Sequence, residues 1–152
     1  MNDYNIMILD DEEAVTALLK TNLELAGLNR IDIFTDPVQA IAMFRNKKYH
    51  ILLTDMDMPE MDGIDVLKKV KQYDPMTQVI MTTEKSTIDK TLACLELGAN
   101  DYVLKPFKSV EYILEVVEYS IKKLERWKEA IKGTVLKQNE ASALPKKLER
   151  IR

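Results

Sequence analysis

The stretch ILLTDMDMPEMDG, residues 51–63, indicates the fold of this chain. Residues 50–54 form a short, largely apolar run between polar neighbours, which is typical of a buried parallel strand. The run ends at Asp55, and Pro59 and Gly63 predict a loop before the next helix. A carboxylate at the end of a buried strand is costly unless a metal, a cation or water compensates its charge. Ligands bind at such strand ends, although most aspartates after strands simply begin a turn.

Five short apolar runs alternate with helical patterns along the whole chain. The predicted strands cover 4–9, 31–34, 50–54, 78–83 and 100–104, and the predicted helices cover 12–26, 37–46, 63–73, 86–97 and about 108–137. Strict alternation predicts a parallel sheet with helices on both faces, and 152 residues are too few for a TIM barrel. We therefore predict an α/β, flavodoxin-like (βα)5 fold: a doubly wound parallel sheet of strand order 2-1-3-4-5, with an extended C-terminal helix.

Charge divides the chain into an acidic body and a basic end. Residues 1–119 carry 12 Lys or Arg and 21 Asp or Glu, a net charge of −9, whereas residues 120–152 carry 10 and 4, a net charge of +6. This asymmetry suggests two segments with different roles. No apolar run approaches the length of a membrane span and the N-terminus lacks a signal pattern, so we expect a cytoplasmic protein without a membrane partner. The single cysteine, Cys94, lies in a helical pattern and is expected to be a small core residue.

The last helical pattern is longer than one face of a small sheet requires, roughly 45 Å at 1.5 Å per residue. Its apolar seam alternates steps of three and four and is interrupted only by Lys128: Val110, Leu114, Val117, Ile121, Leu124, Lys128, Ile131 and Val135. We therefore predict a folded domain, 1–122, then a helical extension, 123–137, that forms a two-stranded parallel coiled coil in a homodimer. A basic, weakly ordered tail, 138–152, follows. The alternative is a helix whose first half packs on the sheet while its second half frays.

Acidic side chains follow two of the predicted strands. Asp10 and Asp11 end the first strand, and the strand order puts them in one crevice with Asp55. Three converging carboxylates repel one another unless a hard cation bridges them, and oxygen ligands of this kind suit Mg²⁺. A carboxylate beside Mg²⁺ can attack a phosphoryl group, whose oxygens then need an ammonium and a hydroxyl as partners. Lys105 and Thr83, at the ends of the fifth and fourth strands, supply these two groups.

These residues together carry a resemblance that covers about residues 1–122. The chain resembles the receiver domain of two-component response regulators, the CheY-like superfamily, in four motifs: Asp10-Asp11, Asp55-x-x-Met58-Pro59-x-Met61-Asp62-Gly63, Thr83 and Lys105-Pro106-Phe107. The resemblance implies a phosphorylation-dependent signalling switch whose phosphoryl donor is a sensor histidine kinase or a phosphotransfer protein. It also implies that the chain is not an enzyme, apart from self-catalysed phosphotransfer and autodephosphorylation.

The resemblance implies a role for each residue of the acidic crevice. Asp55 would be the phospho-acceptor. Asp10, Asp11 and Asp55 would hold Mg²⁺ as a cofactor, joined by the backbone carbonyl of Asp57. Lys105 would contact the phosphoryl group and would be joined to the following proline by a cis peptide bond.

The same resemblance implies a switch formed by two side chains. Thr83 would be the switch hydroxyl, and Tyr102 the aromatic side chain that moves inward when Thr83 engages the phosphoryl group. Thr82 is the alternative, but only the spacing of Thr83 from the other motifs matches the family without gaps. Glu84 then stands where the family usually has a small residue, and we expect it to restrict access to the site or to add charge there.

The sequence says less about the output of the switch than about the chemistry of phosphorylation. We expect the signal to pass through the face made by the fourth helix, the fifth strand and the fifth helix, and into the coiled coil. One alternative is a phosphatase of the haloacid dehalogenase type, because Asp55-Met56-Asp57 resembles the nucleophile-x-acid motif of those enzymes. Another is a receiver fragment of a longer DNA-binding or cyclase regulator. Nucleic-acid binding by this chain alone is not expected, because the basic end lacks a helix-turn-helix or zinc pattern.

Overall fold

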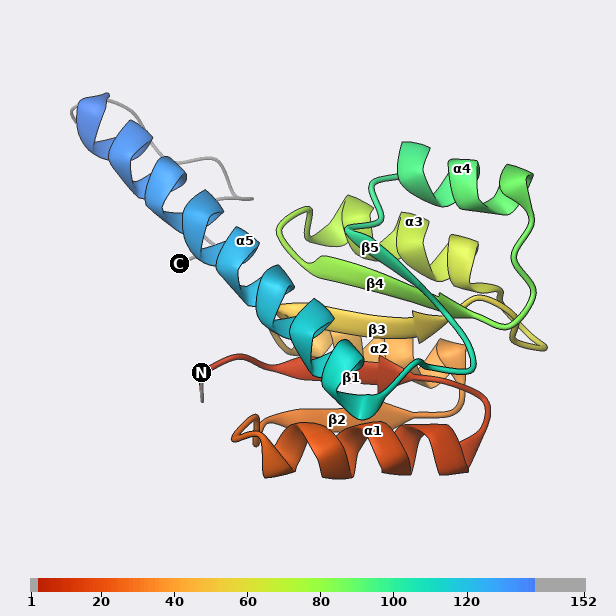
Figure 1. Ribbon diagram of the computed structural model, residues 1–152. Coiled ribbons are helices and arrows are strands. Elements are labelled where there is room, and N and C mark those ends of the chain that lie inside the picture. Colours follow the sequence, from red (N-terminus) through yellow and green to blue (C-terminus); the bar gives the residue numbers. More distant parts are fainter. Residues whose placement is uncertain (1–2, 139–152) are drawn as a thin grey trace.

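The computed structural model describes residues 3–138, which form five strand–helix units (Figure 1). In chain order these are β1 (Ile6–Leu9), α1 (Glu13–Leu25), β2 (Ile31–Phe34), α2 (Pro37–Asn46), β3 (Ile51–Asp55), α3 (Gly63–Tyr73), β4 (Gln78–Thr83), α4 (Ile88–Glu96), β5 (Asp101–Leu104) and α5 (Val110–Lys137). Each predicted strand and helix is present, with bounds that differ from the prediction by a few residues at most.

The strands form one sheet of order β2-β1-β3-β4-β5, and every pair is parallel, which confirms the predicted flavodoxin-like topology. Helices α1 and α5 cover one face of the sheet, and α2, α3 and α4 cover the other (Figure 1). Strands β1, β3 and β4 are buried along their whole length because helices cover both faces. Side chains alternate between two hydrophobic clusters, so Leu53 faces α1 and α5 whereas Leu52 faces α2 and α3.

Local sequence explains where several helices begin and end. The carboxylate of Asp36 accepts a hydrogen bond from the backbone N–H of Val38, and Pro37 occupies the first helical position of α2. Helix α4 begins at Ile88, later than expected, because Thr87 is its N-cap and accepts a hydrogen bond from the N–H of Lys90. Gly98, with φ of +93°, follows the end of α4 in a backbone conformation that other residues adopt only with strain.

Helix α5 has 28 residues and is roughly 42 Å long at 1.5 Å per residue. It runs antiparallel to the strands and continues beyond the amino-terminal edge of the sheet (Figure 1). Much of the seam that predicts a coiled coil is used within the domain, since Val117, Ile121 and Leu124 belong to its hydrophobic core. The core therefore extends past the predicted boundary at residue 122, and Lys128 lies over the ring of Tyr4, 5.1 Å from its centroid.

Two predictions about the rest of the chain have different outcomes. Cys94 is a buried side chain of α4, as expected. The predicted basic tail, 138–152, lies outside the described residues apart from Gln138, the C-cap of α5. Within 3–138, no helix combines the length and the apolar character that a membrane crossing requires.

Candidate functional site

Two aspartates are buried at the carboxyl edge of the sheet, where β1 and β3 end side by side. Asp10 follows β1 and is 2% exposed, and Asp55 is the last residue of β3 and is 5% exposed. Asp11 lies beside them and is exposed to solvent. One carboxylate oxygen from each of the three lies within 4.8 Å of the others. The predicted acidic crevice is therefore formed, with an open side at Asp11.

This crevice fits a small hard cation. The three groups offer only carboxylate oxygens, which suit Mg²⁺, and the exposed position of Asp11 leaves room for water and for a further oxygen ligand. Burial, and next the negative charge of Asp10, raise the pKa of the Asp55 carboxyl to about 6, against the opposing effect of Lys105. The positive charge of a bound cation would offset this repulsion and would therefore favour the ionised form of Asp55.

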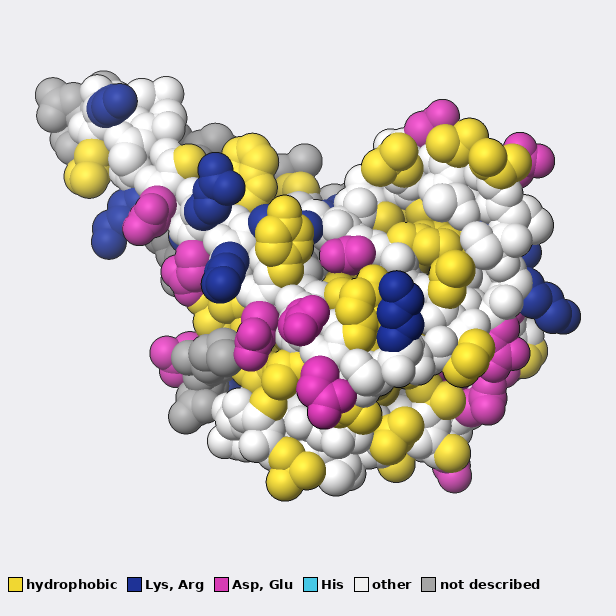
Figure 2. Space-filling model, viewed as in Figure 1, with side chains coloured by type: hydrophobic (Ala, Val, Ile, Leu, Met, Phe, Trp, Pro, Cys, Tyr) yellow, Lys and Arg dark blue, Asp and Glu magenta, His cyan; other side chains and the backbone are white. Residues whose placement is uncertain are grey.

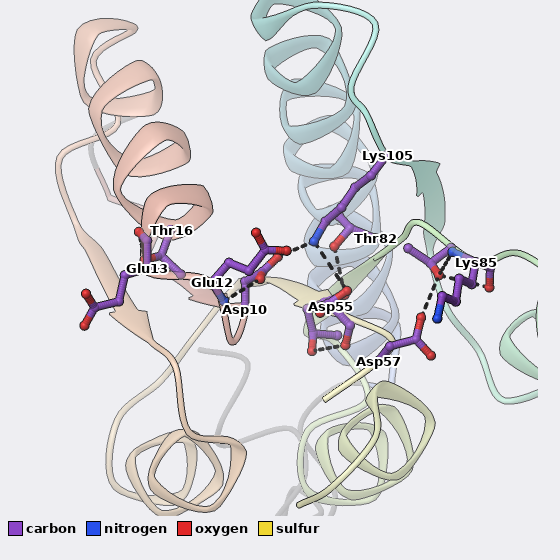
Figure 3. A network of polar contacts seen from close by, with 11 residues as sticks. Asp10, Glu12, Glu13, Thr16, Asp55, Asp57, Thr82, Lys85 and Lys105 are labelled. Carbon is purple, nitrogen blue, oxygen red and sulfur yellow. Dashed lines mark hydrogen bonds and ion pairs between the residues drawn. The ribbon is translucent and has the colours of Figure 1, made fainter. Parts of the chain in front are cut away.

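The ammonium of Lys105 lies between the two buried carboxylates (Figure 3). Its Nζ is 2.5 Å from Oδ2 of Asp10 and 3.4 Å from Oδ1 of Asp55. Burial alone would lower the pKa of Lys105, but the hydrogen bond and charge of Asp10, and then Asp55, raise it above its ordinary value. Lys105 therefore remains protonated. The peptide bond between Lys105 and Pro106 is cis, as the resemblance implied.

The loop after β3 folds closely over the end of the strand. The N–H of Gly63 donates a 2.8 Å hydrogen bond to the carbonyl of Met56. A Cβ atom at residue 63 would lie 2.5 Å from the carbonyl oxygen of Asp55 and 2.8 Å from Cα of Met56. Only glycine allows the first residue of α3 to pack this closely against the backbone of Asp55.

The two adjacent threonines at the end of β4 face different neighbours. Thr82 pairs with Asp55 in the sheet register and lies next to Lys105 and Asp55 in Figure 3. Its hydroxyl donates to the carbonyl of Thr54 at 3.4 Å. The hydroxyl of Thr83, in contrast, lies 3.3 Å from Oδ2 of Asp57. Thr83 as the switch residue remains a prediction.

The side chain of Asp57 has contacts that the sequence did not suggest. In addition to Thr83, its carboxylate contacts the ammonium of Lys90 in α4, at 3.4 Å. Sequence reasoning considered only the backbone carbonyl of Asp57. Lys90 is one of many charged residues in helical patterns and carries no signal that it reaches this loop.

The remaining predicted residues lie near this edge of the sheet. Tyr102 is half-buried, packs against the cluster that faces α3 and α4, and has its hydroxyl 3.5 Å from Oγ of Ser86. Glu84 is exposed and lines a groove together with Lys105 and Phe107. It therefore lies beside the crevice.

The family model of the response regulator receiver domain matches residues 6–118. The chain belongs to this family. Among curated proteins it is 38% identical, over 107 residues, to the alkaline phosphatase synthesis transcriptional regulatory protein PhoP of Bacillus subtilis (strain 168). That match covers 70% of this chain and 44% of PhoP. The chain thus spans about half the length of the curated relatives it matches.

Solved receiver domains have the same fold. A CheY-like receiver domain protein from Methanospirillum hungatei JF-1 aligns with a TM-score of 0.78 and 26% identity, over 81% of this chain and 97% of that one. The BeF3-activated DrrB receiver domain aligns with a TM-score of 0.72 and 26% identity, over 78% and 97%. Receiver domains bind Mg²⁺ at an acidic pocket, and Asp10, Asp11 and Asp55 form such a pocket here.

Membership of the family decides between the two kinds of chemistry that the sequence left open. The chain is the receiver domain of a two-component response regulator, and the haloacid dehalogenase interpretation is wrong. Asp55, the first residue of the motif that suggested a phosphatase, is the last residue of the buried strand β3.

Proposed function

We propose that Asp55 accepts a phosphoryl group from a sensor histidine kinase or a phosphotransfer protein and that this modification switches the domain. The proposal is supported above all by the group of three carboxylates around one buried ammonium at the carboxyl edge of the sheet. A buried carboxylate that is held beside a cation site and a lysine is equipped for nucleophilic attack on phosphorus.

The transfer itself needs few protein groups. An ionised oxygen of Asp55 attacks the phosphorus atom and forms an acyl phosphate. The bond between phosphorus and the donor's imidazole nitrogen breaks, and the imidazole keeps the electron pair. Asp10, Asp11, Asp55 and the backbone carbonyl of Asp57 would hold Mg²⁺, which would supply positive charge for the phosphoryl oxygens. The ammonium of Lys105 compensates the charge that remains.

The donor is proposed to dock beside Lys105. A groove of about 410 Å³ opens there between α1 and the start of α5. Its walls are mainly apolar, and exposed or half-buried side chains such as Leu18 and Val110 contribute to them. An amphipathic helix of a partner fits such a groove, because the apolar face of the helix covers these side chains. Glu84 at the rim would influence which donors enter.

The output is proposed to pass through the face formed by α4, β5 and α5. Three apolar side chains of α4, at spacings of four and three residues, point to solvent: Ile88, Leu92 and Leu95. Figure 2 shows apolar side chains gathered over α4, at the upper right. In the phosphorylated chain, Thr83 would turn to the phosphoryl group and Tyr102 would move inward, which would change this surface.

The long α5 helix is proposed to carry the change to a second copy of the chain. Beyond Leu124, Ile131 is half-buried and still packs against the domain core, so of the predicted seam only Val135 lies past the core. Trp127 is 58% exposed on another side of the helix. A coiled coil would therefore use the end of α5 rather than its middle. Because the chain spans about half the length of relatives such as PhoP, a further output domain beyond this helix is also part of the proposal.

The experiment that tests the proposed function is intact-mass analysis after incubation with acetyl phosphate and Mg²⁺. We expect the wild-type chain to gain one phosphoryl group. The Asp55→Asn variant should gain none, and EDTA present during the reaction should prevent the gain on wild type. A chain that gains no phosphoryl group, or an Asp55→Asn variant that gains one equally fast, would refute the proposal.

A further inference from the structure

The side chain of Asp57 connects two parts of the domain that the switch must move. Its Oδ2 lies 3.3 Å from the hydroxyl of Thr83, at the end of β4, and its Oδ1 lies 3.4 Å from Nζ of Lys90, in the first turn of α4. Both carboxylate oxygens are therefore engaged, one on each side. Figure 3 shows Asp57 directed away from Asp55 and toward the loop that contains Lys85.

Two contacts of Thr83 keep its hydroxyl in this place. The backbone N–H of Lys85 donates to it at 3.1 Å, and it also lies 3.2 Å from the carbonyl of Lys85. The Thr83 side chain is buried. The hydroxyl has a single proton, for which the carboxylate of Asp57 and the carbonyl of Lys85 are both acceptors. If Thr83 is to donate to a phosphoryl oxygen on Asp55, its hydroxyl must give up both of these acceptors.

We propose that the Asp57 carboxylate is a positioning residue that holds the unphosphorylated arrangement, because it binds Thr83 and ties α4 to the loop after β3 through Lys90. This inference rests on the proposed function and adds a resting-state contact to it. Phosphorylation then exchanges one hydrogen bond of Thr83 for another and releases the tie to α4. The role belongs to the side chain of Asp57 and is separate from that of its backbone carbonyl.

The size of the effect follows from the contacts. A hydrogen bond to a carboxylate that favours one of two arrangements changes the apparent affinity for a ligand of the other by about three- to tenfold. The ion pair with Lys90 is 45% and 42% exposed at its two side chains and contributes less, about twofold at most. The carboxylate also carries charge near the site, so its removal has an electrostatic effect that must be separated from the effect on Thr83.

The test is a titration with beryllofluoride, a phosphoryl mimic, in the presence of Mg²⁺, followed by fluorine NMR of the bound species. Asp57→Ala should lower the concentration for half-saturation about three- to tenfold, and Lys90→Gln should lower it by up to about twofold. In a Thr83→Ala background, Asp57→Ala should change it by less than about twofold, because the hydroxyl that Asp57 holds is gone. Glu60→Ala, which removes an exposed acid from the same loop, serves as the control for charge.

Several results would overturn the inference. It fails if Asp57→Ala has no effect on the wild-type background, or has the same effect with and without the Thr83 hydroxyl, because the carboxylate then acts through its charge alone. If Asp57→Ala does not fold, Asp57→Leu in the same two backgrounds decides, since it keeps a side chain of similar size and offers no acceptor to the Thr83 hydroxyl. A wild-type chain that does not bind beryllofluoride refutes the proposed function as well, whereas normal wild-type binding with unresponsive variants refutes only the role of Asp57.

Discussion

The ammonium of Lys105 lies 2.5 Å from the carboxylate of Asp10, although 95 positions separate the two residues in the chain. Strands β1 and β5 are not neighbours, because β3 and β4 lie between them. The Lys105 side chain therefore spans the ends of two strands and brings its charge to the acidic crevice. Both groups are almost fully buried, so each depends on the other for compensation of its charge.

Removal of the Lys105 ammonium should affect stability and phosphorylation in the same direction. We expect Lys105→Met to lower the free energy of unfolding by about 2–4 kcal/mol in EDTA, because Asp10 and Asp55 are left without their cation. The rate of phosphorylation by acetyl phosphate should fall at least about tenfold. Urea denaturation and intact-mass kinetics measure the two effects. Lys69→Met, at an exposed position of α3, is the control and should change neither.

The raised pKa of Asp55 predicts a pH-dependent gain in stability for Asp55→Asn. With a pKa of about 6 in the folded chain and an ordinary value of 3.8, the carboxyl binds its proton more tightly when folded. Its protonation stabilises the folded chain at low pH, and this contribution is lost as the pH rises through about 6. In EDTA, Asp55→Asn should be more stable than wild type by about 1–3 kcal/mol at pH 7.5, and the difference should shrink toward zero near pH 4. An asparagine variant that is less stable at neutral pH would contradict this explanation.

Mg²⁺ should stabilise the wild-type chain through the same carboxylates. At ten times its dissociation constant, a ligand that binds only the folded state adds about 1.4 kcal/mol. We expect a rise in melting temperature with Mg²⁺ for wild type and a much smaller rise for Asp10→Asn and Asp11→Asn. Asp89→Asn, in the first turn of α4, should respond as wild type does. Equal responses in all four proteins would show that the ion binds elsewhere.

Glycine at position 63 should be required for both folding and phosphorylation. A Cβ there would lie 2.5 Å from the carbonyl oxygen of Asp55, so Gly63→Ala forces α3 or the end of β3 to move. We expect a loss of about 1–3 kcal/mol in stability and slower phosphorylation of Asp55. Gly133→Ala is a matched control, because no atom lies within 4 Å of its added Cβ. Because Gly133 lies inside α5, Gly133→Ala should raise the free energy of unfolding of the chain by about 0.5–1 kcal/mol.

Substitutions at two positions of the α5 seam should affect different properties of the chain. Leu124 is 1% exposed in the domain core, so Leu124→Ala should cost about 2–5 kcal/mol of monomer stability. Val135 lies near the end of α5, so Val135→Lys should leave stability within about 0.5 kcal/mol of wild type and weaken self-association. Chemical denaturation and sedimentation velocity separate the two effects. An unchanged sedimentation profile for Val135→Lys would exclude a coiled coil at this end of the helix.

The sequence was sufficient to predict the sheet order and the acidic crevice, because both depend on strong local signals. Apolar strands that end in acids, an Asp-Pro helix start and Gly27 and Gly98 after helices can each be recognised without tertiary information. The topology of a doubly wound sheet then brings the strand ends together.

The features that sequence reasoning missed depend on where long side chains point. The pattern of α5 is compatible with a seam toward a partner or toward the sheet, and only packing shows that Leu124 faces the core. Similarly, the pairing of Lys90 with Asp57 joins a helix to a loop 33 positions earlier, and neither residue has a local pattern that specifies it. The choice between Thr82 and Thr83 likewise depends on which hydroxyl turns toward Asp55.

The most direct test of the account is to identify the residue that carries the phosphoryl group. The chain is incubated with acetyl phosphate and Mg²⁺ and then treated with borohydride, which reduces an aspartyl phosphate to homoserine, and its peptides are sequenced by tandem mass spectrometry. We predict homoserine at position 55 and unmodified aspartate at Asp10, Asp11 and Asp57. Homoserine at one of those three positions, or at none of the four, would contradict the assignment of Asp55 as the phospho-acceptor.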